Sequence, residues 1–360
     1  MSKQNSFARN VIPGAAVLLF AGGVAHAQSN VTLFGEVDGG LLYTSKTLDF
    51  RTGKIGGDQF AMIDSGSAPS LFGLQGSEDL GGGLKATFRL ESGISIANGS
   101  LANSNGNQFG RQAWVALGGK FGEVKAGLQF SPFFVALWDS DPRDFSPFGS
   151  GLVNYVNNVY VTGMFNSNAV SYKSPTIAGL QVRLMMALGG KAGDFQAGRQ
   201  YSASLKYDNG PLMVNAAIYD GNSGGTVQTT IPSTVAFEGR TVGAAYKFGP
   251  LTVKASFVNY KVAGSFNNNV YGAGFGYFVL PQLNIDGGVW TTSDRNRSAN
   301  HSLMAALGTH YFLSKATTLY AQVAVVNNHG KMDTGLSVND ATFAAPGTTT
   351  GVQLGIRHLF

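Results

Sequence analysis

Apolar and polar residues alternate along most of this chain with a period of two. Between residues 31 and 43 the odd positions are apolar or glycine, while the even positions include Glu36 and Asp38. The same alternation recurs in 84–91, 180–186, 201–208, 251–257 and 283–289. Each such segment predicts a strand of about ten residues with one apolar and one polar face. Because charges avoid one face, we expect an all-β protein whose sheet separates two different solvents.

Short and long connections alternate along the chain between these strands. The short ones, rich in Gly, Pro and Asn, fall at 77–83, 118–123, 174–179, 207–211, 247–250, 279–282 and 312–317. The long polar ones fall near 45–67, 93–108, 131–167, 190–199, 221–237, 261–268, 293–301 and 328–349. Short turns then share one rim and long loops the other, and the count is about 16 strands. The pattern predicts a 16-stranded antiparallel transmembrane β-barrel.

The end of the chain agrees with a closed sheet. Alternation continues through Val352, Leu354, Ile356 and His358 up to the terminal Phe360. A closed barrel has no edge strand, so its last strand must pair with its first. We expect Phe360 to sit in the aromatic belt at the membrane interface.

The first 27 residues have the pattern of a secretory signal peptide. Lys3 and Arg9 precede an uncharged apolar stretch, 11–24, which is followed by Ala25, His26 and Ala27. This stretch is shorter than the ~18 residues of a spanning helix. We expect residues 1–27 to be removed and residues 28–360 to form a single barrel domain.

Composition narrows the function classes. Charged residues make up 12% of the chain, about half the ~25% usual for soluble domains. The 25 basic and 20 acidic residues give too weak a positive balance to indicate nucleic acid as a partner. The chain has no cysteine, which excludes disulfides, thiol chemistry and metal sites built on cysteine.

The sequence fits two other classes of protein less well. A soluble propeller would show a sequence repeat near 40 residues, and this chain shows none. A soluble sandwich of this length would usually split into two domains. An outer-membrane enzyme or adhesin is a further alternative. The chain contains no H-x-x-x-H motif, and His310 beside Ser302 and Thr309 is the hint of a hydrolase.

Several segments carry a likeness to one family. "GSEDLGGGLKA" in 76–86, "GRQAWVALGGKFGEVKAGLQFSPF" in 110–133, "YKSPTIAGLQV" in 172–182 and the terminal "GIRHLF" resemble the general porins of Gram-negative outer membranes. The resemblance implies a homotrimer in outer-membrane lipid and a water-filled pore for passive diffusion of small hydrophilic solutes and ions. It also implies an inward-folded third extracellular loop that forms the constriction. No enzyme activity and no cofactor are implied, and a structural calcium ion in the acidic loops is left open.

The segment from Ser131 to Ser167 fits that third loop, since it is the longest in the chain. Its aromatic residues would pack against the inner wall, while Asp139, Asp141 and Asp144 could face the pore, with Phe148 also at the constriction. A substrate-specific channel is the alternative within transport, and Phe165, Phe148 and Trp138 would then form a sliding surface for solutes.

In the family, an arginine cluster on the wall faces the acids of this loop. The resemblance places Arg111 in that cluster, but Leu71, Leu128 and Phe165 stand where arginines are common in the family. Lys85 and Arg89 remain on the polar face, with Glu36 as a counter-charge. The predicted wall side of the constriction is therefore Arg111, Lys85, Arg89, Glu36, Leu71 and Phe165. We expect a weaker anion preference than in strongly basic porins, with a reversal potential that is near neutral or leans toward cations.

Overall fold

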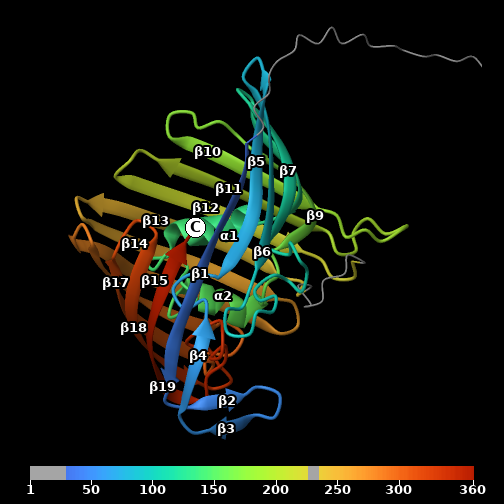
Figure 1. Cartoon of the computed structure of the whole chain (residues 1–360). Helices are drawn as coiled ribbons and strands as arrows, with labels where there is room; N and C mark the ends of the chain where they lie inside the picture. The colour runs from blue at the N-terminus through green and yellow to red at the C-terminus, as the bar shows by residue number, and fades with distance from the viewer. Residues whose placement is uncertain (1–29, 226–234) are drawn as a thin grey trace, which may run out of the picture.

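The computed structural model describes residues 30–225 and 235–360, so the predicted signal segment 1–27 lies outside it. One antiparallel sheet closes on itself around a lumen that contains two short helices (Figure 1). The helices are α1 (Pro132–Ser140) and α2 (Gly151–Val159). The strands are β1 (Asn30–Thr44), β2 (Thr47–Asp49), β3 (Lys54–Gly56), β4 (Gln59–Asp64), β5 (Leu71–Gly81), β6 (Leu84–Gly93), β7 (Gln112–Gly119), β8 (Gly122–Gln129), β9 (Asn166–Lys173), β10 (Leu180–Ala187), β11 (Gln200–Asp208), β12 (Leu212–Gly221), β13 (Glu238–Phe248), β14 (Leu251–Val262), β15 (Phe266–Leu280), β16 (Leu283–Asp294), β17 (His301–Phe312), β18 (Thr317–His329) and β19 (Gly347–Leu359).

The barrel has 16 positions although its sheet contains 17 labelled strands. Both β4 and β5 pair with β1, one after the other, and so they share one position. Strands β2 and β3 form a separate hairpin in the first long connection. The sheet closes where β1 pairs with β19, and Gly35 and Phe360 exchange backbone hydrogen bonds of 2.9 and 3.0 Å. The predicted closed barrel is confirmed, and the terminal residue is part of its seam.

The gap between β4 and β5 has a specific cause. Residues 65–70 belong to no strand and lie against the side chain of Asp38 of β1. The Asp38 side chain is fully buried. The Asp38 carboxylate accepts hydrogen bonds from the backbone N–H groups of Gly66, Ser67 and Ala68 at 2.8–3.1 Å. It also accepts one from the Tyr320 hydroxyl at 2.6 Å. One buried carboxylate thus replaces the ladder bonds that this segment has lost.

The connections follow the predicted order with one exception. All seven short turns lie between the expected strands. The long loop expected at 261–268 is wrong, because β14 ends at Val262 and β15 begins at Phe266, a turn of three residues. Within residues 30–225 and 235–360, no helix has the length and apolar character needed to cross a membrane.

The two faces of the sheet differ as the alternation predicts. On β12, Val214 and Ile218 are exposed on the outside, whereas Met213 and Tyr219 are buried on the inside. Exposed aromatic side chains gather beside the short turns: Tyr246, Phe248, Tyr277, Tyr311 and Phe360. Such a ring is typical of the lipid interface of outer-membrane barrels.

Candidate functional site: a lumen narrowed by the loop between β8 and β9

A cavity of about 980 Å³ occupies the middle of the barrel. It is bordered by residues of β1, β5–β7, β13–β17 and β19 and by the segment 130–165, which we call loop 3. The charged side chains that line it are the basic Arg89, Arg111, Arg143, Lys247, Lys254 and Arg357 and the acidic Glu36, Glu91, Asp144 and Asp286. The lumen is therefore a polar path with a small excess of basic groups.

Loop 3 folds into the barrel as two capped helices. Ser131 caps α1 by accepting the N–H of Phe134 at 3.1 Å, with Pro132 in the first turn, and Ser150 accepts the N–H of Leu152 at 3.0 Å to cap α2. Phe133 is completely buried in a cluster of wall aromatics, with ring centroids 6.1–6.2 Å from those of Tyr219, Phe237 and Tyr260. Apolar packing and caps thus hold loop 3 against the inner wall.

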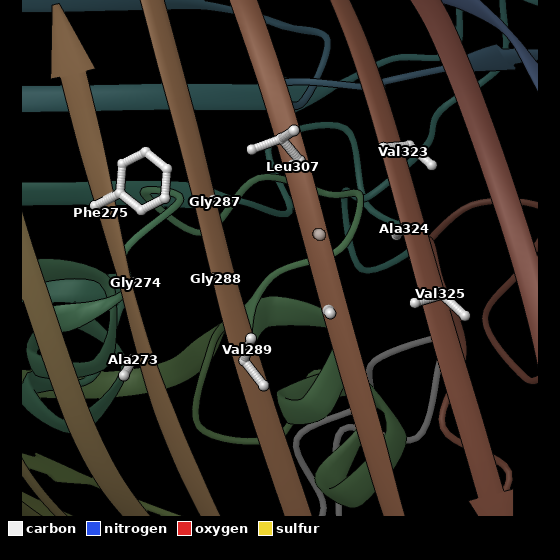
Figure 2. Close-up of a pocket in the computed structure, with 12 residues that line it drawn as sticks. Ala273, Gly274, Phe275, Gly287, Gly288, Val289, Leu307, Val323, Ala324 and Val325 are labelled. Atoms are coloured by element: carbon white, nitrogen blue, oxygen red, sulfur yellow. The ribbon is translucent and has the colours of Figure 1, made fainter.

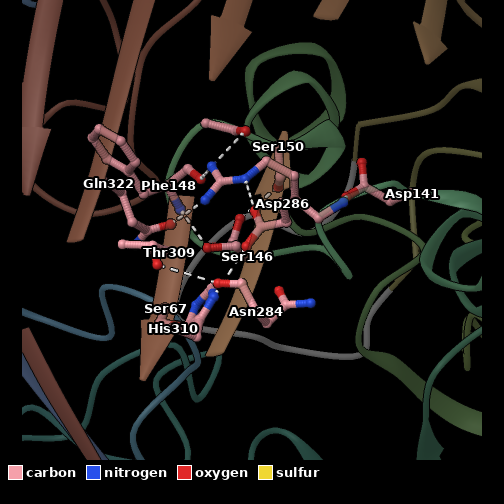
Figure 3. Close-up of polar contacts among 12 residues, drawn as sticks. Ser67, Asp141, Ser146, Phe148, Ser150, Asn284, Asp286, Thr309, His310 and Gln322 are labelled. Carbon is pink, nitrogen blue, oxygen red and sulfur yellow. Dashed lines mark hydrogen bonds and ion pairs between the residues drawn. The ribbon is translucent and has the colours of Figure 1, made fainter. Parts of the chain in front are cut away.

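Arg143 is the main polar anchor of this loop, and its partners Phe148, Asp286 and Gln322 are labelled in Figure 3. Its side chain is fully buried, and its Nε donates to Asp286 of β16 at 2.5 Å. Its remaining nitrogens donate to the carbonyl oxygens of Phe148 and Gly149 at 2.7 and 3.0 Å and to the Gln322 side chain of β18. A buried guanidinium with all of these partners ties the loop tip to two strands of the wall.

Two lysines of the wall hold loop 3 from the other side. Lys254 of β14 donates to Asp144 at 2.6 Å and to the carbonyl oxygen of Asp141 at 2.9 Å. Lys206 of β11 lies 3.2 Å from Asp139. The two loop acids are thus paired with the wall that supports the loop, which reduces the negative charge they present to solutes.

Asp141 has a structural position between the two helices. Its carboxylate accepts the N–H groups of Arg143, Phe145 and Gly151 at 2.7–3.0 Å. Burial raises the pKa of the Asp141 carboxyl, and the three N–H donors oppose that rise. Asp141 therefore joins the end of α1 to the start of α2 and is not in contact with the pore.

The opposite wall carries a compact charge cluster. Glu91 of β6 is buried and binds both Arg89, at 2.5 Å, and Arg111, at 2.7 Å. The Arg89 guanidinium also lies 4.2 Å from the ring centre of Phe34, and that of Arg111 lies 5.8 Å from that of Phe165. We call the part of the cavity bordered by Arg89, Arg111, Phe165 and Asp144 the eyelet.

Six of the ten residues predicted at the constriction line the cavity: Glu36, Leu71, Arg89, Arg111, Phe165 and Asp144. Four do not. Lys85 is exposed next to the short turn after β5, and Asp139 lies outside the cavity lining, on Lys206. Asp141 and Phe148 are buried, because one binds backbone N–H groups and the other packs in the apolar core, so their expected pore-facing position is wrong. Leu128 pairs with Ala113 and also lies outside the lining.

The sequence interpretation missed the role of Arg143. It is the one basic residue between Ser131 and Ser167, which is the signal that could have drawn attention to it. Its partner Asp286 lies 143 positions away, so no local pattern connects the two. Arg357 of β19 was likewise not singled out, although it lines the cavity.

Ser67, His310 and Asp286 form a chain that resembles a nucleophile relay. Ser67 Oγ lies 3.0 Å from His310 Nε2, and His310 Nδ1 lies 3.0 Å from Asp286 Oδ2 (Figure 3). Hydrolysis also needs N–H donors for an oxyanion. The N–H groups of Gly66, Ser67 and Ala68 already bind Asp38, so the arrangement favours a structural link over catalysis. In the described residues, no group of three or more His, Asp or Glu side chains is placed to hold a metal ion.

The comparisons with known proteins agree with this architecture. Outer membrane porin protein 32 of Delftia acidovorans is 31% identical over 96% of this chain and 98% of its own length. An outer membrane porin of Bordetella pertussis is 28% identical over 98% of this chain and its whole length. Among solved structures, an anion-selective porin from Comamonas acidovorans superposes with a TM-score of 0.77 at 28% identity, covering 92% of this chain and all of the other.

A more distant barrel shares the fold alone. OmpT of Vibrio cholerae, solved in a trimer form, has a TM-score of 0.66 at 14% identity and covers 92% of this chain and 99% of its own. The sequence pattern of the family described as Gram-negative porin matches residues 14–331. The chain therefore belongs to the Gram-negative porins: it is an outer-membrane β-barrel that acts as a diffusion channel and not as an enzyme.

Proposed function

We propose that this porin is weakly anion-selective and that the eyelet is the part of the lumen that selects solutes. The observation that carries this proposal is the pairing of charges in the cavity. Glu91 neutralises part of the Arg89 and Arg111 charge, Asp144 binds Lys254, and Asp286 binds Arg143. With six Arg or Lys and four Asp or Glu side chains in the lining, the excess of these residues is two positive charges.

That excess sets the expected size of the preference. Two charges acting at ~10 Å through water contribute ~0.8 kcal/mol, which screening over about one Debye length in 0.1 M salt reduces to ~0.3 kcal/mol. Chloride is stabilised and potassium is destabilised by this energy, so the difference of ~0.6 kcal/mol is about a threefold preference for anions. Leu71 and Phe165 line the same cavity and add no charge. The direction agrees with the anion-selective relative, and the small size follows from the paired acids.

The geometry gives less support to a substrate-specific channel. Trp138 and Phe165 line the cavity, but Phe148 is buried, so the three aromatics do not form one continuous surface for a sliding solute. The substrates that fit are therefore small hydrophilic anions and neutral solutes that pass by size and charge.

We also propose that the chain assembles as a homotrimer in outer-membrane lipid. Its support is the distant relative solved as a trimer, and the proposal is independent of the charges in the lumen.

The reversal potential across a planar bilayer under a tenfold KCl gradient tests the selectivity. We expect a modest potential on the anion side, equal to a chloride-to-potassium permeability ratio of about three. A cation-side potential, or a strong anion potential near the Nernst limit, would contradict the charge pairing described here. Conductance steps in groups of three in the same recording would support the trimer, and single steps only would argue against it.

A further inference from the structure

A hollow of about 380 Å³ opens on the outer face of strands β15 to β18 (Figure 2). Its shape follows from the strand register. One row of outward positions crosses the four strands as Ala273, Val289, Ala305 and Val325, and the next row as Phe275, Gly287, Leu307 and Val323. Small and large side chains alternate in the first row, and in the second row Gly287 lies between the large Phe275 and Leu307. The small residues therefore form a depression that the large ones surround.

The depression belongs to the lipid side of the sheet. Val289, Leu307 and Val323 are 42–48% exposed, while the neighbouring Ala306 and Ala324 point inward and are buried. A Cβ atom built on Gly287 would lie 3.2 Å from Leu307 Cδ1 and 3.4 Å from Phe275 Cε1. These two side chains thus lean over the glycine and form the walls of the hollow.

Polar groups follow directly above the hollow, toward the long loops. The next outward row contains Tyr271, Thr291, Leu303 and Asn327, and the one after it Asn269, Ser293, His301 and His329. The rings of His301 and His329 stack with centroids 4.5 Å apart. Ala305 lies four residues from His301, or ~13 Å along the strand, close to the ~15 Å hydrocarbon depth of one leaflet.

The rim beyond these histidines is basic. Arg295 and Arg297 are exposed in the connection from β16 to β17, and Lys331 is exposed just after β18. The nearest acid, Asp294, is buried and accepts N–H groups of Asn267 and Asn296 at 3.2 and 2.9 Å. Asp333 is half-buried in the following loop. The outer surface at this rim therefore carries mainly positive charge.

We propose that the hollow and its basic rim bind one phosphorylated, acylated lipid of the outer leaflet, with an acyl chain in the hollow and a phosphate at Arg295, Arg297 and Lys331. The hollow lies within the size range of ligand sites, and it is apolar where the bilayer is apolar. Arginine and lysine bind phosphate through charge-assisted hydrogen bonds. A second copy of the barrel is a poorer occupant of the hollow. Its apolar outer face would have to pack against the polar side chains of Ser293, Asn327 and His329.

Native mass spectrometry of the whole barrel with bisphosphorylated lipid A tests this site. Ala305→Phe fills the hollow from the lipid side, and we expect it to weaken retention of the lipid about tenfold. Ala216→Phe is the matched control, because Ala216 is an exposed, outward alanine on β12, away from the hollow. The double variant Arg295→Gln/Arg297→Gln should weaken binding of bisphosphorylated lipid A and leave a dephosphorylated form unchanged. Retained KCl conductance confirms that each variant is folded.

Three outcomes would overturn the proposal. Equal lipid retention by Ala305→Phe, Ala216→Phe and the unchanged protein would show that the hollow holds no chain. Equal binding of lipid A and phosphatidylethanolamine, insensitive to the two arginines, would exclude an outer-leaflet phosphate at the rim. Cross-linking of two copies through a cysteine introduced at Ala305 would assign the hollow to a protein interface instead.

Discussion

Replacing Arg143 by methionine is expected to release the tip of loop 3, raise the single-channel conductance and admit larger solutes. Methionine keeps much of the side-chain volume but removes the bonds to Asp286, Gln322 and two carbonyl oxygens. It also leaves the Asp286 charge without its arginine in a buried site. Breaking a buried ion pair by removing one partner costs roughly 3–5 kcal/mol. Conductance in planar bilayers and swelling of proteoliposomes in sugars of increasing size measure the change.

The control for this variant is Arg240→Met on β13. Arg240 is exposed and lies 3.5 Å from Glu238, an exposed pair of the kind worth ~0–1 kcal/mol. It should leave conductance, size limit and resistance to heat unchanged. If Arg143→Met showed the same size limit as Arg240→Met, apolar packing of α1 alone would hold loop 3, and Arg143 would not be its anchor.

Glu91→Gln is expected to shift the pore clearly toward anions. Glutamine keeps a hydrogen-bond acceptor for Arg89 and Arg111 but removes the negative charge between them. One added unit of positive charge acting at ~5 Å through water stabilises chloride and destabilises potassium by ~0.8 kcal/mol each, so at low salt the chloride-to-potassium permeability ratio should rise about tenfold or more. Reversal potentials at low salt measure the shift, which should shrink as salt screens the added charge.

Glu123→Gln is the matched control on the same barrel. Glu123 also pairs with two cations, Lys125 at 3.7 Å and Lys173 at 3.3 Å, but it lies beside a short turn and outside the cavity lining. It changes the net charge by the same amount, so it should move the reversal potential far less. Equal shifts in both variants would place selectivity in the overall charge of the pore and not at the eyelet.

The barrel could be predicted from the sequence because the alternation of apolar and polar residues along a strand is a local signal. The pairing of Gly35 with Phe360 follows from a last strand that must meet the first. The break in strand pairing at 65–70 could not be predicted from the sequence. It depends on one buried carboxylate, Asp38, which accepts hydrogen bonds from a segment about 28 residues away. The turn at 263–265 was read as a loop because polar residues at a strand end resemble loop composition.

The site was predicted better on the wall than in loop 3, where only Asp144 of the four predicted residues lines the cavity. Arg89 and Glu36 lie on strands and Arg111 directly precedes β7, where alternation indicates which side chains face the lumen. Loop 3 has no such period, so the directions of its side chains depend on long-range partners. Asp141 and Phe148 were placed at the pore although both are buried, and the anchor Arg143 was missed because Asp286 lies on a strand far along the chain.

Modification of a single introduced cysteine tests the position of the pore most directly, because the natural chain has none. The side chain of Asp144 is 79% exposed at the eyelet, whereas Asp49 lies on the exposed hairpin of β2 and β3. After reaction with a sulfonate-bearing methanethiosulfonate, Asp144→Cys should lose much of its chloride current, and Asp49→Cys should keep all of it. Complete modification of Asp144→Cys with an unchanged current would contradict an eyelet at loop 3.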